Sequence, residues 1–248
     1  MKIETILTPT ELPALAQRDL RATACVVFDV LRATSTFVTA LHHGAKAIIP
    51  VSQIAEALEI KKNRPEVLLG GERNGIRISA DGIDFDLGNS PREYTPEKVR
   101  GKTIVSTTTN GTRALRACVG AKIILASSFL NLGATAEFLR REQAETILLV
   151  CAGTGKNQAD EDVLAAGALI ELLTARGDAR PTFSDSTKIA LKFYAESKFK
   201  LAEVVFNSEN ARRLLAISEL RDDVAFCLQR DIFPLVPKME ADGMIRKS

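Results

Sequence analysis

Short apolar runs that alternate with helix-like stretches constrain the fold of this chain more than any other feature of its sequence. Strands are expected at residues 24–30, 47–51, 66–69, 102–106, 122–126 and 146–151. Helices are expected at residues 34–43, 54–62, 111–118, 132–142 and 160–175, the last ended by Gly177. Such alternation is typical of layered α/β proteins, because each helix covers a face of the sheet that its neighbouring strands build. The pattern therefore predicts an α/β fold.

The rest of the chain departs from this alternation. Residues 70–98 are dense in glycine, aspartate, asparagine and proline, so we expect a long irregular loop, a kind of segment that is often functional. Residues 184–230 have a mostly helical pattern, which predicts a helical C-terminal third. The stretch 233–237 is too rich in proline for a central strand and is expected to be irregular. The 248 residues suffice for one unit, 1–248, or for two packed sub-lobes, about 1–180 and about 181–248.

The composition is ordinary for a globular protein and narrows the function classes. The net charge is +2, with 46% apolar and 26% charged residues, so nothing indicates a nucleic-acid or membrane partner. No apolar run approaches the roughly 20 residues that a membrane-spanning helix needs. The first four residues lack the apolar region of a signal peptide. We therefore expect a cytoplasmic location.

The two adjacent histidines and the four widely spaced cysteines disfavour triad, zinc and disulfide chemistry. The two histidines, His42 and His43, precede Gly44 and are expected to be solvated at the C-terminal end of a helix. A Ser-His-Asp triad or a zinc site is therefore disfavoured. The four cysteines are widely spaced and form no CxxC pair, so we expect neither disulfides nor a thiolate metal site.

A weak internal repeat relates two parts of the chain. Gly-Ala-Lys occurs at residues 44–46 and again at 120–122, each time after a strand, a loop and a helix and before an apolar strand. Superposing the two copies places residues 34–36 over residues 110–112, where a strand feeds a helix in both cases. Two similar helix starts could therefore converge on one ligand.

The first strand end with unusual residues follows the expected strand 24–30. It carries Asp29, Arg32, Thr34, Ser35 and Thr36, which are a carboxylate, a guanidinium and three hydroxyls at a helix start. Helix amides favour an anion at such a place, Arg32 could clamp it in a bidentate manner, and Asp29 beside it suggests a bridging magnesium ion. The alternative is that a hydroxyl caps the helix and Asp29 pairs with Arg32. The residues alone leave both interpretations open.

The second strand end carries a run of hydroxyls followed by Asn-Gly. Thr108, Asn110, Gly111, Thr112 and Arg113 open a helix, and their donors suit phosphate or carboxylate oxygens. The alternative is a turn with a helix cap and no ligand. Three consecutive threonines favour a functional role, because they form helices poorly and a cap needs only one of them.

The third strand end combines glycines with an acidic helix start. Gly153 permits a close approach of the backbone to a ligand, and Glu161 and Asp162 lie in the first turn of the next helix. Acidic residues also favour a helix N-terminus without any ligand, so a metal role and a purely structural role both stay open. Cys151 precedes the glycine in an apolar strand, where a nucleophilic thiolate is disfavoured.

The long loop adds a second group of polar residues. Glu72, Arg73 and Asn74 stand between glycines just beyond a strand, and Asn89 and Ser90 precede a proline. The alternative is a solvated loop without function. Familiar phosphoryl-transfer motifs are absent from the chain: there is no GxxxxGK[ST] loop, no Cys-x5-Arg loop, and no second aspartate two residues after Asp29.

Together these segments resemble the 2-phosphosulfolactate phosphatase family of the coenzyme M pathway. The matching strings are DVLRATST at 29–36, GERNG at 71–75, FDLGNSP at 85–91, TTNGT at 108–112, and CAG at 151–153 with EDVLAAG at 161–167. Each string is moderately specific, whereas all of them in this order over nearly the whole chain are highly specific. The resemblance implies a three-layer α/β/α fold with a largely parallel or mixed sheet. It also implies a magnesium-dependent phosphatase that converts 2-phosphosulfolactate to sulfolactate and phosphate.

The resemblance agrees with the chemistry of the strand ends and assigns roles to their residues. Magnesium prefers hard oxygen ligands, and the expected ligands are Asp29, Glu72, Glu161 and Asp162. Asp29 is expected to act as metal ligand or base, or to form a covalent aspartyl-phosphate, and Arg32 and Arg113 are expected to stabilise charge on the phosphoryl group. The expected substrate-binding residues are Thr34, Ser35, Thr36, Arg73, Asn74, Asn89, Ser90, Thr108, Asn110, Gly111, Thr112 and Gly153.

Two other functions stay open at this stage. One is a phosphatase for another small phospho-2-hydroxy acid, and the other is a non-catalytic protein that binds anions. A homodimer is expected from base rates alone.

Overall fold

Two groups of parallel strands form the sheet of this protein. The computed structural model describes residues 1–175 and 181–248, so Gly177 and the expected boundary near residue 180 lie outside the described residues. The first group runs in the order β11 (Thr182–Phe183), β1 (Lys2–Ile6), β10 (Thr146–Cys151), β2 (Thr23–Phe28) and β9 (Ile123–Ser127). The second group holds β3 (Ala47–Pro50), β8 (Thr103–Thr107) and β4 (Leu68–Arg73), with the antiparallel strand β5 (Ile76–Arg77) at its edge.

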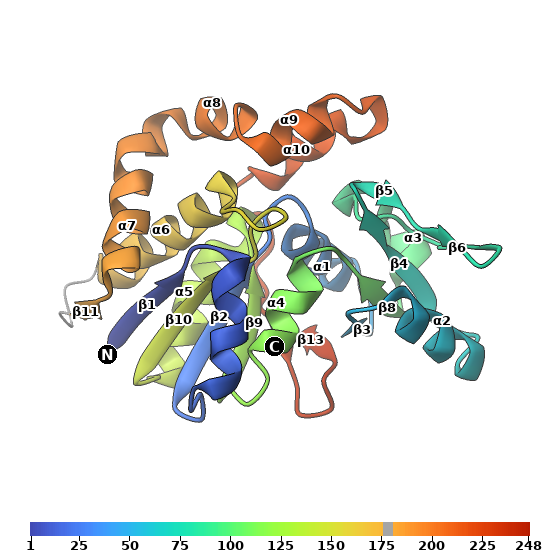
Figure 1. Ribbon diagram of the computed structural model, residues 1–248, viewed down its shortest axis with the longest axis horizontal. Coiled ribbons are helices and arrows are strands. Elements are labelled where there is room, and N and C mark those ends of the chain that lie inside the picture. Colours follow the sequence, from blue (N-terminus) through green and yellow to red (C-terminus); the bar gives the residue numbers. More distant parts are fainter. Residues whose placement is uncertain (176–180) are drawn as a thin grey trace.

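A C-terminal hairpin joins the two groups into one mixed sheet (Figure 1). Its strands, β12 (Pro237–Met239) and β13 (Ile245–Lys247), run antiparallel to each other. Lys238 pairs with Leu125 of β9, and Ile245 pairs with Ile48 of β3. The last residues of the chain therefore bridge strands that are much earlier in the sequence.

Helices cover both faces of the sheet, which confirms the three-layer α/β/α fold. Ala24 and Val26 of β2 face α5 (Leu132–Glu142) and α6 (Asp160–Thr174), whereas Cys25 and Val27 belong to the core beneath α1 (Ala33–His42) and α4 (Gly111–Ala117). This division follows from the two-residue period of a strand, and both sets are apolar because both faces are covered. In the second group, α2 (Ile54–Asn63) covers the outer face through Ala57.

The C-terminal third is mostly helical, as expected. Its helices are α7 (Asp185–Ser197), α8 (Leu201–Phe206), α9 (Glu209–Leu215) and α10 (Arg221–Cys227), and they run along one side of the molecule, from α7 beside β1 to α9 and α10 above the strand ends (Figure 1). Tyr194, Leu214 and Val224 belong to the same apolar core as α6. Gly167 of α6 allows α7 to approach closely, because a Cβ at this position would lie 2.4 Å from the Ala190 carbonyl oxygen.

Three sequence-based expectations need correction. Residues 70–98 are not an irregular loop throughout, since β4 continues to Arg73 and is followed by β5, β6 (Ser79–Ala80), β7 (Ile83–Asp84), a 3-10 turn and α3 (Pro96–Val99). Gly71 is a strand residue, and it is needed because φ is 148° and a Cβ would lie 2.1 Å from the Thr107 carbonyl oxygen of β8. The glycine that suggested a loop at this position therefore reflects a close approach of β4 and β8.

The other two corrections concern the ends of the chain. The stretch 233–236 is irregular as expected, but Pro237 begins a strand inside the sheet, at the first position, where proline is tolerated. The segment Lys2–Ile6 forms β1 between β10 and β11, with Ile3 fully buried, although no strand was expected there. In the parts of the chain that the structure describes, no helix is long and apolar enough to cross a membrane.

Candidate active site

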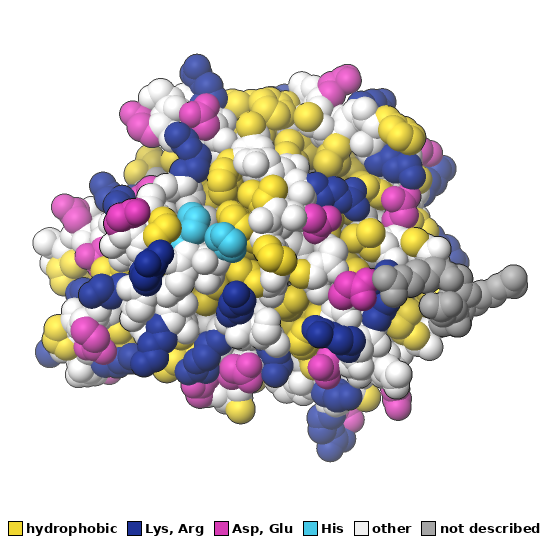
Figure 2. Space-filling view, turned by 180° about the vertical axis from the view of Figure 1, so that it is seen from behind, with side chains coloured by type: hydrophobic (Ala, Val, Ile, Leu, Met, Phe, Trp, Pro, Cys, Tyr) yellow, Lys and Arg dark blue, Asp and Glu magenta, His cyan; other side chains and the backbone are white. Residues whose placement is uncertain are grey.

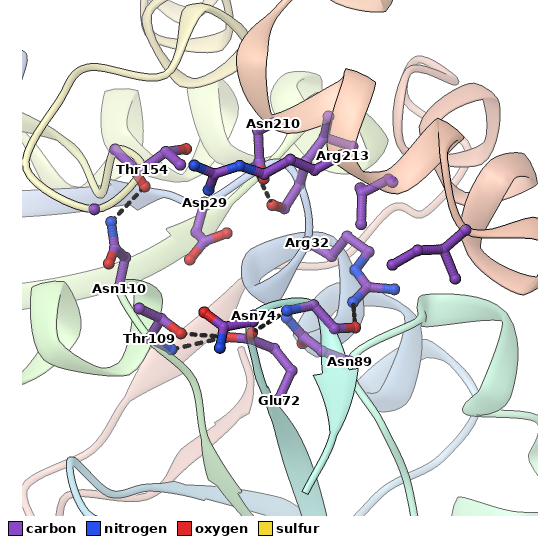
Figure 3. A pocket seen from close by; sticks show the side chains of 16 residues that line it. Asp29, Arg32, Glu72, Asn74, Asn89, Thr109, Asn110, Thr154, Asn210 and Arg213 are labelled. Carbon is purple, nitrogen blue, oxygen red and sulfur yellow. Dashed lines mark hydrogen bonds between the residues drawn. The ribbon is translucent and has the colours of Figure 1, made fainter.

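A cavity of about 400 Å³ lies where strands of both groups end, beneath α9 (Figure 3). Its floor comes from the segments that follow β2, β4, β8 and β10, which are carboxyl ends of parallel strands, the usual position of a ligand site in an open α/β sheet. The lining residues are Asp29, Leu31, Arg32, Glu72, Asn74, Gly75, Asn89, Thr109, Asn110, Gly153, Thr154, Gly155, Asn210, Arg213, Leu214 and Ile217.

The two copies of the internal repeat meet at this cavity. In one copy α1 leads from β2 in the first group to β3 in the second, and in the other α4 leads from β8 back to β9. Asp29 and Asn110 precede these helices and both line the cavity. The two helix starts are in contact, because a Cβ on Gly111 would lie 2.5 Å from Oδ2 of Asp29. The two helix starts therefore meet beside one cavity, Gly111 is the residue that permits their contact, and their convergence on one ligand stays a prediction.

Asp29 is a nearly buried carboxylate that faces the cavity. It is 8% exposed, and its Oδ1 accepts a hydrogen bond of 3.1 Å from the backbone N–H of Ala33 at the start of α1. Burial raises the pKa of Asp29 to about 7; the negative charges of Glu72 and Glu161 also raise it, and the Ala33 amide opposes the shift. A carboxyl group of this kind can gain or lose a proton near neutral pH.

Glu72 is a second carboxylate in the cavity, held by the ends of β4 and β8. Its Oε1 accepts hydrogen bonds from the backbone N–H and the hydroxyl of Thr109, at 2.8 and 2.9 Å. Its Oε2 accepts a 2.8 Å hydrogen bond from the backbone N–H of Gly75. Figure 3 shows the Thr109 hydrogen bonds and places Glu72 opposite Asp29 across the cavity. Glu72 is therefore fixed in orientation from both sides.

The asparagines of the floor differ in how they are bonded. Asn110 donates from Nδ2 to the carbonyl oxygens of Ala152 and Gly153, at 3.0 and 2.6 Å, and so ties the end of β8 to the end of β10. Oδ1 of Asn89 and Oγ1 of Thr154 are buried and have no hydrogen-bond partner among the residues that the structure describes. Both residues line the cavity, and because buried polar atoms are normally bonded, these two oxygens mark places where the hydrogen bonding behind its wall is incomplete.

Glu161 and Asp162, two of the three acidic residues in the first turn of α6, are buried and do not line the cavity. Asp162 accepts hydrogen bonds from the backbone N–H groups of Val30, at 2.8 Å, and of Gly153, at 3.0 Å. Burial raises the pKa of Asp162 well above its usual range, and the charge of Asp29 adds to the effect. Glu161 is fully buried, and burial likewise raises its pKa. Asp162 thus holds two strand-end turns in place.

Most of the predicted hydroxyl ligands are bonded within the protein. The side chain of Thr34 accepts from the Asp29 amide, Ser35 donates to the Val30 carbonyl, and Thr36 donates to the Asn89 carbonyl. Thr108 and Thr112 exchange hydrogen bonds, each hydroxyl accepting from the other's backbone N–H at 3.1 to 3.2 Å. None of these five residues is among those that line the cavity. They shape the helix starts.

The predicted arginines are placed in three different environments. Arg32 lines the cavity, but its guanidinium donates at 2.7 Å to Asp223 of α10 and at 2.7 Å to the Gly75 carbonyl, so it does not pair with Asp29. Arg73 bonds the Glu72 carbonyl and Thr107 and lies outside the lining. Arg113 is exposed on α4, also outside the lining.

Ser90 and Cys151 also stand apart from the cavity. Ser90 donates from Oγ to Asp223 at 2.7 Å, so this fully buried carboxylate receives both Ser90 and Arg32. Cys151 is fully buried, and burial raises the pKa of its thiol well above the usual range, which disfavours a nucleophilic role. His42 and His43 lie at the surface near Phe233, on the side seen in Figure 2, and do not line the cavity.

Sequence reasoning missed the wall that α9 provides. Asn210, Arg213 and Leu214 line the cavity, and their spacing of three and four residues places them on one face of α9; Ile217, just after the helix, adds to the wall. Asn210 fixes this face to the floor, because its Nδ2 donates to the Leu31 carbonyl at 2.6 Å and to Oε1 of Glu161 at 3.1 Å. The spacing was visible in the sequence, but nothing there indicated that this face turns toward the strand ends.

The donor set of the cavity fits a magnesium ion held by few protein ligands. Across residues 1–175 and 181–248, no group of three or more His, Cys, Asp or Glu side chains is placed to hold a metal ion. Asp29 and Glu72 nevertheless line one cavity, and Asn89 lines it as well. Magnesium in phosphoryl-transfer sites is commonly bound by one or two carboxylates together with water and phosphate oxygens. The carboxylates of Asp29 and Glu72 would supply the protein ligands of such a magnesium ion.

The fold and the cavity define an α/β/α protein with a carboxylate-bearing site at its strand ends, and comparison with known proteins identifies its family. The family model described as 2-phosphosulpholactate phosphatase matches residues 7–242. A "Probable 2-phosphosulfolactate phosphatase" of Caldanaerobacter subterraneus subsp. tengcongensis is 41% identical over 237 residues, 95% of each chain. One from Thermotoga maritima is 44% identical over 86% of this chain and 88% of its own, and one from Thermosynechococcus vestitus is 35% identical over 100% of both.

The chain therefore belongs to the 2-phosphosulfolactate phosphatase family, a family of phosphoric monoester hydrolases. The match covers nearly the whole chain, and the resemblance seen in the sequence motifs is confirmed.

Proposed function

We propose that this protein is a magnesium-dependent phosphatase that hydrolyses 2-phosphosulfolactate to sulfolactate and phosphate. Its family membership supports the reaction. The observation that carries the proposal is the pair of carboxylates, Asp29 and Glu72, which face one cavity from the two strand groups. In hydrolysis of this ester, water attacks phosphorus, the bond from phosphorus to the ester oxygen breaks, and the departing oxygen of sulfolactate takes up a proton.

Asp29 and Glu72 would hold the magnesium ion, which when bound supplies positive charge against the phosphoryl oxygens. The backbone N–H groups and the Thr109 hydroxyl fix Glu72, so its orientation does not depend on the ligand. Asp29 has a pKa of about 7 and an oxygen beside Gly111 at the cavity, so it suits metal binding or proton transfer to and from water. A covalent aspartyl-phosphate on Asp29 is the alternative, and trapping a phosphorylated protein after rapid quenching distinguishes the two.

The cavity is large enough for a small phosphate ester. Its volume of about 400 Å³ lies in the range typical of small-ligand sites. Arg32 and Arg213 line it and bring positive charge to it. A substrate that carries phosphate, carboxylate and sulfonate groups is strongly anionic and suits such a site once a divalent cation is bound.

The test is phosphate release from racemic 2-phosphosulfolactate by the purified protein, with magnesium and then with excess EDTA. Phosphoglycolate and phospholactate serve as parallel substrates. We expect fast, EDTA-sensitive release that prefers phosphosulfolactate. A preference for another ester would replace the substrate and keep the chemistry. Phosphate binding without release from any ester would support a non-catalytic anion-binding protein instead.

Three further expectations accompany this proposal. A role in coenzyme M biosynthesis follows from the family resemblance, a cytoplasmic location from the sequence, and a homodimer from base rates. Each stays a prediction, and the oligomeric state can be measured by light scattering.

A further inference from the structure

The charges around the cavity differ in how firmly they are already bound. Among the described residues that line it, Arg32 and Arg213 are the two arginines, and there is no lysine. Arg32 is 2% exposed and is bonded to the fully buried Asp223 and to the Gly75 carbonyl. Removing Arg32 from Asp223 would leave a buried carboxylate without its cation, which is strongly unfavourable. A substrate that drew Arg32 away from Asp223 would therefore destabilise the protein, so Arg32 is not available for substrate binding.

Arg213 is held much more loosely. Its Nη2 donates to Oε1 of Glu209 at 2.6 Å, one helical turn earlier on α9, and the two side chains are 61% and 53% exposed. Such a solvated pair contributes little to stability, so an incoming anion can replace Glu209 with little loss. Figure 3 shows the Arg213 side chain reaching from α9 across the upper side of the cavity toward Thr154. The guanidinium is thus largely exposed, held by one surface ion pair, and placed at the cavity.

The rest of the α9 face suits a short carbon chain that ends in an anion. Leu214 lines the cavity beside Arg213 on α9, Ile217 lines it just after the helix ends, and Leu31 lines it from the turn after β2. Leu214 also packs within 3.9 Å of the position that a Cβ on Gly75 would occupy, so α9 reaches the second strand group. Asn210 fixes the position of α9 relative to the floor through its two hydrogen bonds. In the proposed function the floor carboxylates hold magnesium for the phosphate, so the α9 side is left for the tail.

We infer that Arg213 binds the negatively charged tail of the substrate, the sulfonate or carboxylate, and thereby selects anionic esters over neutral ones. This inference rests on the proposed phosphatase activity and adds the residue that determines its specificity. In the bound state Arg213 leaves Glu209 and forms a charge-assisted hydrogen bond to the tail, while the phosphate lies at the floor. Guanidinium groups pair well with planar or tetrahedral oxyanions because their N–H donors form a fixed fork.

The experiment compares kcat and KM for three esters in wild-type protein and four variants. The esters are 2-phosphosulfolactate, phospholactate, which lacks the sulfonate, and glycerol 2-phosphate, which has no anionic tail. The Arg213→Gln variant is expected to raise KM for 2-phosphosulfolactate roughly 10- to 100-fold with little change in kcat, and to leave glycerol 2-phosphate unaffected. The KM of the Arg213→Lys variant for 2-phosphosulfolactate should lie between the values of wild type and Arg213→Gln. Phospholactate then tells whether the carboxylate or the sulfonate is the group recognised.

Two variants separate recognition from a structural role of α9. Arg212→Gln removes a neighbouring exposed arginine that does not line the cavity, and it is expected to match wild type on all three esters. Glu209→Gln removes the competing carboxylate and is expected to lower KM for the anionic esters a few-fold. Equal KM increases for charged and neutral esters in Arg213→Gln would overturn the inference, and so would wild-type KM values.

Failure of the proposed function itself is recognisable. If wild-type protein releases phosphate from none of the esters, the proposed function is wrong, and binding of sulfolactate is then measured by calorimetry. Weaker binding to Arg213→Gln but not to Arg212→Gln would keep Arg213 as the anion-recognising residue. Equal binding by both variants would overturn that role as well.

Discussion

The floor and the α9 wall of the cavity are built in opposite ways. On the floor, Glu72 is fixed by three hydrogen bonds to residues of two segments. Asn110 on the floor and Asp162 behind it tie neighbouring strand ends together. On the wall, Arg213 is held by one exposed pair within its own helix. A fixed arrangement of charges suits a reaction, because donors and acceptors need no reorganisation. A loosely held cation suits recognition of a ligand that comes and goes.

This difference predicts that variants of floor residues lower kcat/KM for all substrates, whereas variants of wall residues lower it only for substrates with charged tails. It also predicts that floor and wall contribute very differently to stability.

Replacing Asp29 with asparagine should remove the activity while the fold stays intact. The amide oxygen of the new side chain can still accept the Ala33 N–H, but the side chain carries no charge for metal binding and no proton to exchange, so we expect a loss of roughly 10³-fold or more in kcat. Steady-state phosphate release measures the effect, and circular dichroism with a thermal melt is the control for folding. Wild-type activity in this variant would contradict the role of the floor.

Replacing Asp223 with alanine should destabilise the protein strongly. The change leaves Arg32, which is 2% exposed, without its partner and removes the acceptor of the Ser90 hydroxyl, so we expect a loss of about 3–5 kcal/mol in the free energy of unfolding. Urea denaturation gives the value. Asp222→Ala is the matched control, since its side chain is 73% exposed, and it should change the free energy by less than about 0.5 kcal/mol. Equal effects of the two variants would show that the Arg32–Asp223 pair does not anchor the site.

The stability of the metal-free protein should depend on pH through Asp29. Its pKa is raised from 3.8 to about 7 on folding, so the folded state binds this proton more tightly than the unfolded state does. The resulting stabilisation is complete below about pH 4 and is lost as pH rises to about 7. In EDTA at pH 8, Asp29→Asn should therefore be more stable than wild type by roughly 2–4 kcal/mol, with a smaller difference at pH 5. A difference that stays constant between these pH values would contradict the raised pKa.

Replacing Glu209 with glutamine should have the smallest effect on stability. The variant loses one exposed ion pair at a spacing of four residues, so we expect a change of about 0.3–0.5 kcal/mol in the free energy of unfolding. The same urea titration measures it. A loss of several kcal/mol would mean that Arg213 is held as firmly as Arg32, and the contrast between floor and wall would disappear.

The sequence predicted the floor better than the wall, for physical reasons. Asp29, Asn110 and Gly153 come shortly after strands, and carboxyl ends of parallel strands share one edge of the sheet, so the alternation of strands and helices was enough to group them. Arg213 and Asn210 reach the cavity only because α9 packs over that edge, and the amphipathic pattern of a helix does not tell which element it will cover.

Pairings over long distances in the sequence explain the remaining differences. Arg32 and Asp223 stand 191 residues apart, so their buried pair could not be inferred, and Arg32 looked free to bind phosphate. Thr34, Ser35 and Thr36 likewise looked like ligands, although each hydroxyl is bonded to a backbone group of the protein. Gly71 looked like a loop residue because its contact with Thr107 is a tertiary one.

The most direct test is the ratio of kcat/KM for 2-phosphosulfolactate to that for glycerol 2-phosphate in wild type, Glu72→Gln and Arg213→Gln. The account predicts that Glu72→Gln lowers both values by a similar factor and leaves the ratio near that of wild type. It predicts that Arg213→Gln lowers the ratio roughly 10- to 100-fold by acting on the anionic ester alone. A ratio that falls in Glu72→Gln, or that stays unchanged in Arg213→Gln, would contradict the assignment of the reaction to the floor and of selection to α9.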